Sequence, residues 1–355
     1  MEQHIGHRSY YQNLRDVIDQ NPELDASWVP VTYQHRPTIG GKSSPWLPTV
    51  KGSLAGRLQV RQGAQQATER DVAFFNTQVP AVLGGKVAQQ QPYILSTDIT
   101  PLQYDEMAEH YEHHPDSDNL WSFYKYRTNV KVFQKAARIV PWSSWAAESL
   151  VQDYGVDPNR IEVIAPGVNT NVWRPDTSKE TTKPCKILFV GGDFERKGGN
   201  LLLKAFRSLP KGLAELMLVT RSHVPSSDNI KVYRNMQPNS AELIQLYQSC
   251  DLFVLPTQAE AFGIAAIEAC AVGLPVVATR VGGLTDIVVD GETGFLIEAG
   301  DIEALAQRLQ LLAENDALRQ SFGSAARQRA ERYFDNGRNA KRIATIIKEV
   351  VGERS

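Results

Sequence analysis

Two carboxylates, Glu260 and Glu268, stand in a segment that is otherwise nearly all apolar residues and glycine, PTQAEAFGIAAIEACAVGLPVVAT. Carboxylates that face one another can carry out acid–base or nucleophilic chemistry. On one continuous helix, however, two side chains with this separation point ~80° away from each other, because each residue turns the helix by ~100°. A shared helical face does not explain the spacing, and the two acids are expected to have different roles.

The elements around these acids follow from the local pattern. DLFVLPT is predicted to be a buried strand, QAEAFG its exit loop, and IAAIEACAV a helix that ends at Gly273. Glu260 then lies in the loop, and Glu268 is the only charge in an apolar helix, so it is expected to be buried. A buried carboxylate needs hydrogen-bond donors, and ribose hydroxyls are suitable ones. Pairing with a nearby Lys or Arg is the alternative for each acid.

A second stretch, ILFVGGDFERKGGNLLLKAF, has the features of an anion site. A strand and a glycine turn precede Arg196 and Lys197, and a helix is predicted to begin near Gly199. The backbone amides and the dipole of a first helical turn favour negative charge, so a diphosphate is the natural ligand. The spacing fits neither G-x-G-x-x-G nor G-x-x-x-x-G-K-[ST], which disfavours a nicotinamide or nucleoside triphosphate site. A glycine turn with surface cations is the alternative interpretation.

The helix that carries Glu268 offers a further anion position at its start. The backbone amides of Phe262, Gly263 and Ile264 could bind a second phosphate. Gly263 permits close approach because it has no side chain. These three residues are therefore candidate ligand-binding groups.

Short apolar runs alternate with helical patterns along the whole chain, which predicts an α/β fold with two doubly wound, Rossmann-like sheets. The runs are continuously apolar, as expected for parallel sheets covered by helices on both faces. Nothing before GHRSYYQNLRDVI has the character of a buried strand, so the first strand of the N-terminal domain is expected to be missing. The predicted strands are WVPVTY, DVAFFNT, PYILST, ARIVPW and IEVIAP, followed by CKILFVGG, AELMLVT, IKVYRN, DLFVLPT, LPVVAT and GFLI.

A chain of 355 residues exceeds the size at which one hydrophobic core keeps growing. We predict an N-terminal Rossmann-like domain over residues 1–175, a second one over 185–335, and a C-terminal helix over 336–355 that packs on the body. The polar segment 169–184 is the predicted linker, with its hinge at 171–184. Because ligands bind beyond the carboxyl ends of parallel strands, the site is expected in a cleft between two facing domains.

Composition and charge exclude several classes of partner. A formal net charge of -2 gives no field that would attract DNA or RNA. Cys185, Cys250 and Cys270 lie in apolar contexts without metal-ligand spacing, which predicts buried thiols in a reducing compartment. No apolar run approaches the ~20 residues that span a bilayer, and the polar start is not typical of a signal peptide. We predict a cytoplasmic protein, and peripheral docking on a membrane surface stays open.

From about Ala137 to its C-terminus, the chain resembles the retaining glycosyltransferases of family 4, which have the GT-B fold of two facing Rossmann-like domains. PTQAEAFGIAAIEACAVGLPVVATRVGGLTDIVVDGETGFLI is similar to the E-x7-E signature of that family and its downstream glycines. IVPWSSWAAESLVQDYGVDPNRIEVIAPGVNTNVWRP resembles the segment that closes the acceptor domain. The resemblance implies that Glu268 binds the nucleotide ribose, that Glu260 lies beside the donor sugar, and that Lys197 neutralises the diphosphate.

The chain departs from the family pattern after the first strand of the donor domain. Where many members have Gly-Arg-Leu, this sequence has Gly192 followed by Asp and Phe, so the usual first phosphate-binding cation is absent. Arg196, next to Lys197, is the candidate substitute, and Gly192 stays a candidate donor-binding residue.

A second departure lies in the acceptor domain. Many members have a His near the donor sugar, whereas YILSTDITP places Asp98 there, as a candidate catalytic residue or as a turn or capping Asp. EQHIGHRSYYQNL resembles the first loop and helix of some members, which implies that Gly6 and His7 face the diphosphate.

Two other stretches are predicted to have no part in the chemistry. EHYEHHPDSDN contains three His residues and the D-x-D sequence of residues 116–118, but no apolar strand precedes them, so a solvated loop is expected instead of a metal site. WSFYKYRTNVKVFQKAA is expected to form a helix whose aromatic residues belong to its core face. The alternative is that these aromatic rings contact a sugar or lipid acceptor.

The predicted function is that of a glycosyltransferase in EC class 2.4 and in carbohydrate biosynthesis. It would move a sugar, with retention of configuration, from a nucleotide-diphosphate sugar to a glycan, lipid or small-molecule acceptor. No metal and no cofactor are expected. The alternative is a nucleotide-sugar-binding protein without transferase activity. A nicotinamide-dependent oxidoreductase ranks third because the required phosphate fingerprint is missing.

Overall fold

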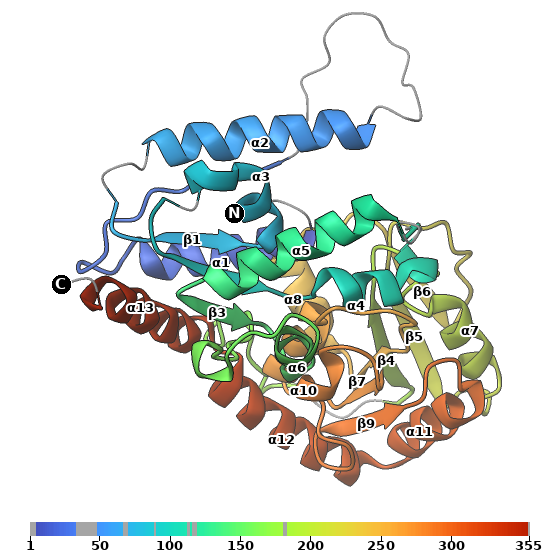
Figure 1. Cartoon of the computed structure of the whole chain (residues 1–355). Coiled ribbons are helices and arrows are strands. Elements are labelled where there is room, and N and C mark those ends of the chain that lie inside the picture. Colours follow the sequence, from blue (N-terminus) through green and yellow to red (C-terminus); the bar gives the residue numbers. More distant parts are fainter. Residues whose placement is uncertain are drawn as a thin grey trace, which may run out of the picture. The chain divides into compact units, whose positions relative to one another are not determined.

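The computed structural model describes residues 5–32, 48–66, 70–88, 90–111, 114–115, 119–179 and 183–353. The chain forms two compact units (Figure 1). Unit 1 consists of residues 1–105, 114–165 and 337–355, and unit 2 consists of residues 106–113 and 166–336. The C-terminal helix α13 (Asn336–Gly352) therefore belongs, from residue 337 on, to the unit that contains the N-terminus.

The sheet of unit 1 has the strand order β1-β2-β3 in the described part of the chain, and all its neighbours are parallel. Its core is built from apolar side chains of the strands and of helix α5, including Leu95, Phe133 and Ile139. The strands are β1 (Ala73–Asn76), β2 (Tyr93–Thr97) and β3 (Arg138–Pro141), and the other elements are α1 (Ile5–Ile18), α2 (Pro48–Gln66), α3 (Gln78–Ala88), α4 (Pro101–Glu106), α5 (Leu120–Lys135), α6 (Ser144–Gln152) and the 3₁₀ turn η2 (Pro158–Arg160).

Two of the predicted strands do not form. IEVIAP runs beside β3 and makes one isolated bridge, Ile139 to Ile161, with Val163 turned partly to solvent and Pro166 unable to donate a backbone hydrogen bond. WVPVTY contains Pro30, which likewise lacks an N–H, and forms no strand over its described residues 28–32. Both segments are largely apolar, but IEVIAP donates only two backbone hydrogen bonds to β3, from Glu162 and Ile164.

Unit 2 contains a larger parallel sheet with the order β6-β5-β4-β7-β8-β9. This is the doubly wound order in which the chain starts at the centre, grows to one edge and then to the other. The prediction of buried parallel sheets is confirmed. The strands are β4 (Cys185–Val190), β5 (Ala214–Val219), β6 (Ile230–Tyr233), β7 (Leu252–Leu255), β8 (Val276–Thr279) and β9 (Gly294–Ile297). The helices of this unit are η1 (Ala108–Tyr111), α7 (Gly199–Arg207), α8 (Ala241–Ser249), α9 (Ile264–Ala271), α10 (Leu284–Ile287), α11 (Ile302–Glu314) and α12 (Asp316–Tyr333).

The strand order reverses between β4 and β7, which pair through Ile187 with Leu252 and Leu188 with Phe253. In an open α/β sheet, this switch point is where a ligand binds, beyond the carboxyl ends of the strands. The loop after β4 covers residues 191–198 and the loop after β7 covers residues 256–263. These are the loops in which the sequence placed its candidate residues.

The predicted linker segment has no helix or strand in its described residues and packs on unit 2. Its Trp173 is buried edge-on against the ring of Tyr247, with 5.2 Å between the ring centroids. The three cysteines are buried and free, as predicted.

Candidate functional site

The loops after β4 and β7 are joined at the switch point by main-chain and side-chain contacts. The backbone carbonyl of Arg196 accepts hydrogen bonds from the N–H of Gln258 (3.0 Å) and from the hydroxyl of Thr257 (3.2 Å). Beside them the ammonium of Lys197 forms an ion pair with the carboxylate of Glu260, and both side chains are largely buried. The structure thus brings two predicted site residues into direct contact. Glu260 thus pairs with a Lys, as in the alternative stated for each acid in the sequence analysis.

Lys197 is a cation in an environment that does not favour its charge. The pKa of its ammonium is lowered to about 7, mainly by burial and also by the neighbouring Arg196, while Asp193 acts in the opposite direction. The carboxylate of Glu260 supports the charged form by direct attraction. An anionic ligand at this position would favour the ammonium for the same reason.

Arg196 is held by three contacts within unit 2. Its Nε lies 3.1 Å from a carboxylate oxygen of Asp193, one Nη donates to the carbonyl of Ala259 (2.9 Å), and the guanidinium lies 4.6 Å from the ring centroid of Tyr111. Asp193 is the residue that stands where many family members have a cation. It therefore neutralises Arg196 in part, and a role of Arg196 at a phosphate requires these contacts to change.

Another cation, Arg221, lies against the glycine turn and was not found from the sequence. A Cβ atom at Gly192 would lie 2.8 Å from an Nη atom of Arg221, so the missing side chain leaves room for that guanidinium. Arg221 is exposed, and it makes no hydrogen bond or ion pair within the described ranges. It follows β5, the strand beside β4. The only sequence signal is a cation directly after a buried strand.

Glu268 is buried in α9, as predicted, and its contact is with a tyrosine. The hydroxyl of Tyr247 in α8 donates to its carboxylate at 3.0 Å. Burial raises the pKa of Glu268 to about 7, while this hydrogen bond acts in the opposite direction. Among the residues that the structure describes, no Lys or Arg forms an ion pair with Glu268. Glu268 therefore differs from Glu260, which has a cationic partner.

The start of α9 lies directly after Glu260. Gly263, the N-cap residue, has φ 106°, a left-handed conformation that an L side chain rarely adopts. The first turn of a helix leaves backbone N–H groups without intrahelical acceptors, which makes it suitable for an anion. Phe262 is buried beside it and Ile264 begins the helix, so the three predicted residues form this turn.

A polar cluster lies at the carboxyl ends of the strands in unit 1. The imidazole of His7 lies between two side chains, with Nε2 3.4 Å from the carboxylate of Asp98 and Nδ1 3.2 Å from the amide nitrogen of Asn76. Since an amide nitrogen donates, Nδ1 accepts and Nε2–H points to Asp98. The two predicted residues His7 and Asp98 are thus brought together, and Gly6 precedes His7 in α1.

Asn76 and Trp142 complete this cluster and were missed by the sequence analysis. The carboxamide oxygen of Asn76 is buried without a hydrogen-bond partner among the described residues. The ring of Trp142 packs on His7 with centroids 5.0 Å apart, and its N–H donates to Ser96 at 2.9 Å. A polar residue at the end of a buried strand was the available signal for Asn76.

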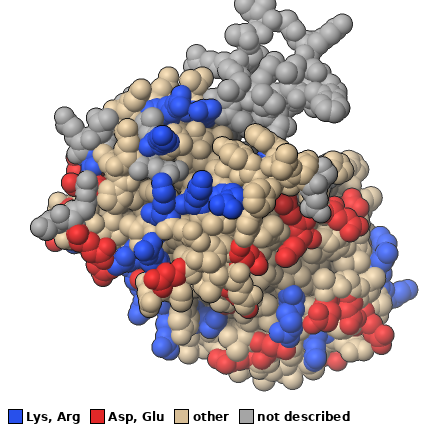
Figure 2. All heavy atoms as spheres, viewed as in Figure 1, with Lys and Arg blue, Asp and Glu red and all other residues tan. Residues whose placement is uncertain are grey.

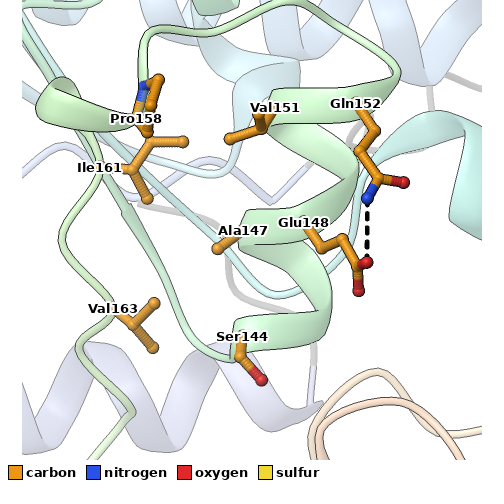
Figure 3. Close-up of a pocket in the computed structure, with 8 residues that line it drawn as sticks. All are labelled: Ser144, Ala147, Glu148, Val151, Gln152, Pro158, Ile161 and Val163. Carbon is orange, nitrogen blue, oxygen red and sulfur yellow. Dashed lines mark hydrogen bonds between the residues drawn. The ribbon is translucent and has the colours of Figure 1, made fainter.

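One hollow in the described part of the chain lies away from the candidate site. It is an open pocket of about 450 Å³ on unit 1 between α6 and the segment after η2. Figure 3 shows Ala147, Val151, Ile161 and Val163 turned toward one another, while Glu148 points away to Gln152. A smaller hollow of about 200 Å³ in unit 2 is lined by residues of the linker segment, α8 and α12. Neither pocket contains a predicted site residue.

No group of three or more His, Cys, Asp or Glu in the described part of the chain could hold a metal ion. The D-x-D sequence of residues 116–118 and His113 lie outside the described residues. No helix of the described ranges is both long and apolar enough to pass through a membrane.

Glycosyltransferase family models match segments in both halves of the chain. One family model, glycosyltransferase family 4, matches residues 21–172, and a second, glycosyl transferases group 1, matches residues 223–329. The chain is 33% identical over 214 residues to a D-inositol 3-phosphate glycosyltransferase of Corynebacterium diphtheriae, covering 52% of this chain and 49% of the relative. It is 31% identical over 199 residues to the capsular polysaccharide biosynthesis glycosyltransferase CapM of Staphylococcus aureus, covering 50% and 52%. The chain spans about half the length of the curated relatives it matches.

Solved structures with the same fold cover more of the chain. Sucrose-phosphate synthase from Thermosynechococcus elongatus superposes with a TM-score of 0.72 at 21% identity, covering 90% of this chain and 85% of that one. HepE from Anabaena, solved in complex with UDP, gives a TM-score of 0.67 at 21% identity, with 84% of each chain covered. These likenesses confirm the predicted α/β fold of the GT-B type.

Proposed function

The chain belongs to the family 4 glycosyltransferases, and on that premise we propose that it transfers a sugar from a nucleotide-diphosphate sugar to an acceptor. The observation that carries this proposal is the buried pair of Lys197 and Glu260 at the switch point, directly before the first turn of α9. The relatives named above are glycosyltransferases, and HepE was solved with UDP and with UDP-glucose, which supports a nucleotide-sugar donor.

The donor site would use a different group for each part of the ligand. The carboxylate of Glu268, oriented by Tyr247, accepts hydrogen bonds from the ribose hydroxyls. The diphosphate lies between Lys197, Arg221 and the first turn of α9. Glu260 then contacts the donor sugar.

Binding of the diphosphate would exchange the partner of Lys197. In the structure the ammonium is paired with Glu260, and two phosphate groups offer it more negative charge than one carboxylate. When Lys197 turns to the phosphate, Glu260 is released to the sugar, where it can stabilise positive charge that develops at the ring. One ion pair thus supplies both a cation for the leaving group and an anion for the sugar.

We propose retention of configuration because the resemblance to the retaining family 4 enzymes implies it, and independence of metal ions because of the groups in the site. Negative charge develops on the leaving nucleoside diphosphate, and preorganised cations and backbone amides stabilise such charge strongly in a site that excludes water. The site provides two cations and a helix start for this purpose. On this proposal no metal ion is needed to stabilise the negative charge of the leaving group.

Unit 1 is proposed to bind the acceptor. Asp98 is oriented by His7, so its carboxylate is available to hold an acceptor or sugar hydroxyl in a fixed direction. A direct role for Gly6 and His7 at the diphosphate stays a prediction.

The test is a thermal-shift screen with UDP, GDP and ADP and with their sugars, followed by product detection with candidate acceptors. A stabilising nucleotide sugar and a detectable transferred product are expected for the wild type. Lys197→Ala and Glu268→Ala should lose both, and unchanged binding and turnover in Glu268→Ala would remove the central assignment.

The alternative, a nucleotide-sugar-binding protein without transferase activity, is favoured by one observation. Asp193 neutralises Arg196, a cation that could otherwise assist the leaving group. Donor binding without turnover would support this alternative, and Asp193→Gly would then be expected to raise activity from a very low level.

A further inference from the structure

Helix α5 presents large aromatic side chains to solvent, which corrects the prediction that they form its core face. Trp121 is 59% exposed, Phe123 57% and Tyr124 61%, and the first residue, Leu120, is 89% exposed. The helix is anchored instead through Val132 and Phe133, which are buried in the core of unit 1. Large exposed clusters of apolar side chains commonly mark a surface that binds a protein, a membrane or a ligand.

The exposed residues form a continuous row along the helix. Phe123 and Tyr124 follow Leu120 by three and four residues, and Arg127 follows them by four and three. Lys131 comes four residues after Arg127, so all five lie on one face. The row is apolar and aromatic in its first half and basic in its second. The capping box of Asn119 fixes the start of the helix, so these side chains project from a defined backbone.

The charge on this helix has a single sign. Its four cations, Lys125, Arg127, Lys131 and Lys135, are exposed, and its sequence contains no Asp or Glu. Lys125 lies 5.8 Å from the ring of Trp121, so cations and rings occupy the same surface. Figure 2 shows Lys and Arg side chains gathered over α5 and over α2 and α3 on this face of unit 1.

We propose that this row, the α5 face, docks unit 1 on an anionic lipid surface. Aromatic rings are favoured at the boundary between headgroups and acyl chains, and Lys and Arg are attracted to anionic headgroups. A second copy of the chain is disfavoured because two such faces would bring cations of like charge together. A protein partner is disfavoured because three of the four cations on this helix are Lys, which is depleted at protein interfaces. The proposal is independent of the transferase activity, since lipid binding requires no turnover.

The test is co-sedimentation of the full chain with vesicles of phosphatidylcholine alone and of phosphatidylcholine mixed with phosphatidylglycerol. Binding is expected only to the mixed vesicles and should weaken as salt rises. Replacing Arg127 and Lys131 together by Gln should lower the partition coefficient about 25-fold, because each cation near an anionic surface contributes about fivefold. Phe123→Ser with Tyr124→Ser should lower it about tenfold or more, since binding scales with the apolar area inserted.

The matched control removes exposed apolar side chains from another surface of the same unit. Val151 and Val163 line the open pocket beside α6 and are each 37% exposed. Val151→Ser with Val163→Ser should leave vesicle binding unchanged, and circular dichroism with thermal unfolding should show that all variants are folded.

Three results would overturn the proposal. The first is no binding of the wild type to anionic vesicles, and the second is equal binding by wild type and both α5 variants. The third is that the Phe123→Ser, Tyr124→Ser variant keeps its vesicle binding but loses turnover on a soluble acceptor or changes oligomeric state in light scattering. In that case the α5 face contacts an acceptor glycan or a second copy.

Discussion

Replacing Glu268 by Gln is expected to make the protein more stable at neutral and alkaline pH and less able to bind a nucleotide sugar. Burial raises the pKa of this carboxyl group from 4.5 to about 7, and its described partner is the Tyr247 hydroxyl at 3.0 Å. Ionising the group inside the fold is therefore unfavourable. Gln has nearly the same shape, accepts the same hydrogen bond from Tyr247, and does not ionise.

The sign and size of the effect follow from proton linkage. Because the pKa is higher in the folded state, the unfolded chain loses this proton first, and the free energy of unfolding falls as pH rises from 4.5 to about 7. The full loss is about 3 kcal/mol at 1.36 kcal/mol per pKa unit. Between pH 5 and pH 8 the wild type should lose about 2 to 3 kcal/mol relative to Glu268→Gln. For a unit of this size, that corresponds to roughly 5 to 10 °C in Tm.

Urea unfolding of both proteins at several pH values between 5 and 8, followed by tryptophan fluorescence, measures this difference. Any contribution of the substitution that does not depend on pH cancels in the comparison. Glu314→Gln is the control, because Glu314 is an exposed acid on α11 of the same unit that accepts a hydrogen bond from Gln310. A difference between wild type and Glu268→Gln that stays constant from pH 5 to pH 8 would refute the burial argument.

The same variant tests the proposed role at the ribose. Hydrogen bonds to a charged acceptor are stronger than those to a neutral one by about 1 to 1.5 kcal/mol, so Glu268→Gln should bind the nucleotide sugar about tenfold more weakly. Calorimetric titration measures this. A variant that is more stable and binds equally well would leave Glu268 without a role in binding.

Three further predictions concern the remaining site residues. The pKa of Lys197 is lowered to about 7, mainly by burial, and an anion favours the charged ammonium. The affinity for a nucleoside diphosphate should therefore be full below pH 7 and fall up to about tenfold per pH unit above it. Lys197→Arg should flatten this pH profile in calorimetric titration, and an unchanged slope would contradict the prediction. Gly192→Ala should displace the guanidinium of Arg221 and weaken diphosphate binding as much as Arg221→Gln does. The double variant should then show little further loss of affinity, whereas additive losses would show that Gly192 and Arg221 do not act together. Asp98→Ala should lower kcat about tenfold or more while KM for the nucleotide sugar stays constant, and an equal loss in donor affinity would place Asp98 at the donor instead.

The sheet of unit 2 could be predicted because its strands are largely apolar runs. Runs such as those of β4 and β7 are covered on both faces, and such runs are ambiguous only between strand and buried helix. IEVIAP has the same composition but failed as a strand. Whether a run becomes a strand depends on backbone partners, and at this edge β3 offers acceptors for only two residues, Glu162 and Ile164. Composition does not encode that difference.

The acids were located by local signals, whereas their partners were not. Glu260 and Glu268 could be assigned to loop and helix from the turn and the apolar helix that surround them. Tyr247, which holds Glu268, looks in sequence like any other core residue of an amphipathic helix. Arg221 becomes significant only when β5 is placed beside β4. In each case the missing information is the order of strands in the sheet.

Lys197 and Glu268 have opposite charges when ionised, yet burial moves their pKa values toward the same value, about 7. For each group the cost of desolvating the charged form is the largest cause of the shift, and for Lys197 the ion pair with Glu260 acts against it. On the proposed function, one ligand supplies what each group needs: a diphosphate anion for the ammonium and ribose donors for the carboxylate. A nucleotide sugar would then charge both groups at once. Near pH 7 its binding should therefore take up about half a proton at Lys197 and release about half a proton from Glu268, so that the net proton exchange is small although both groups titrate.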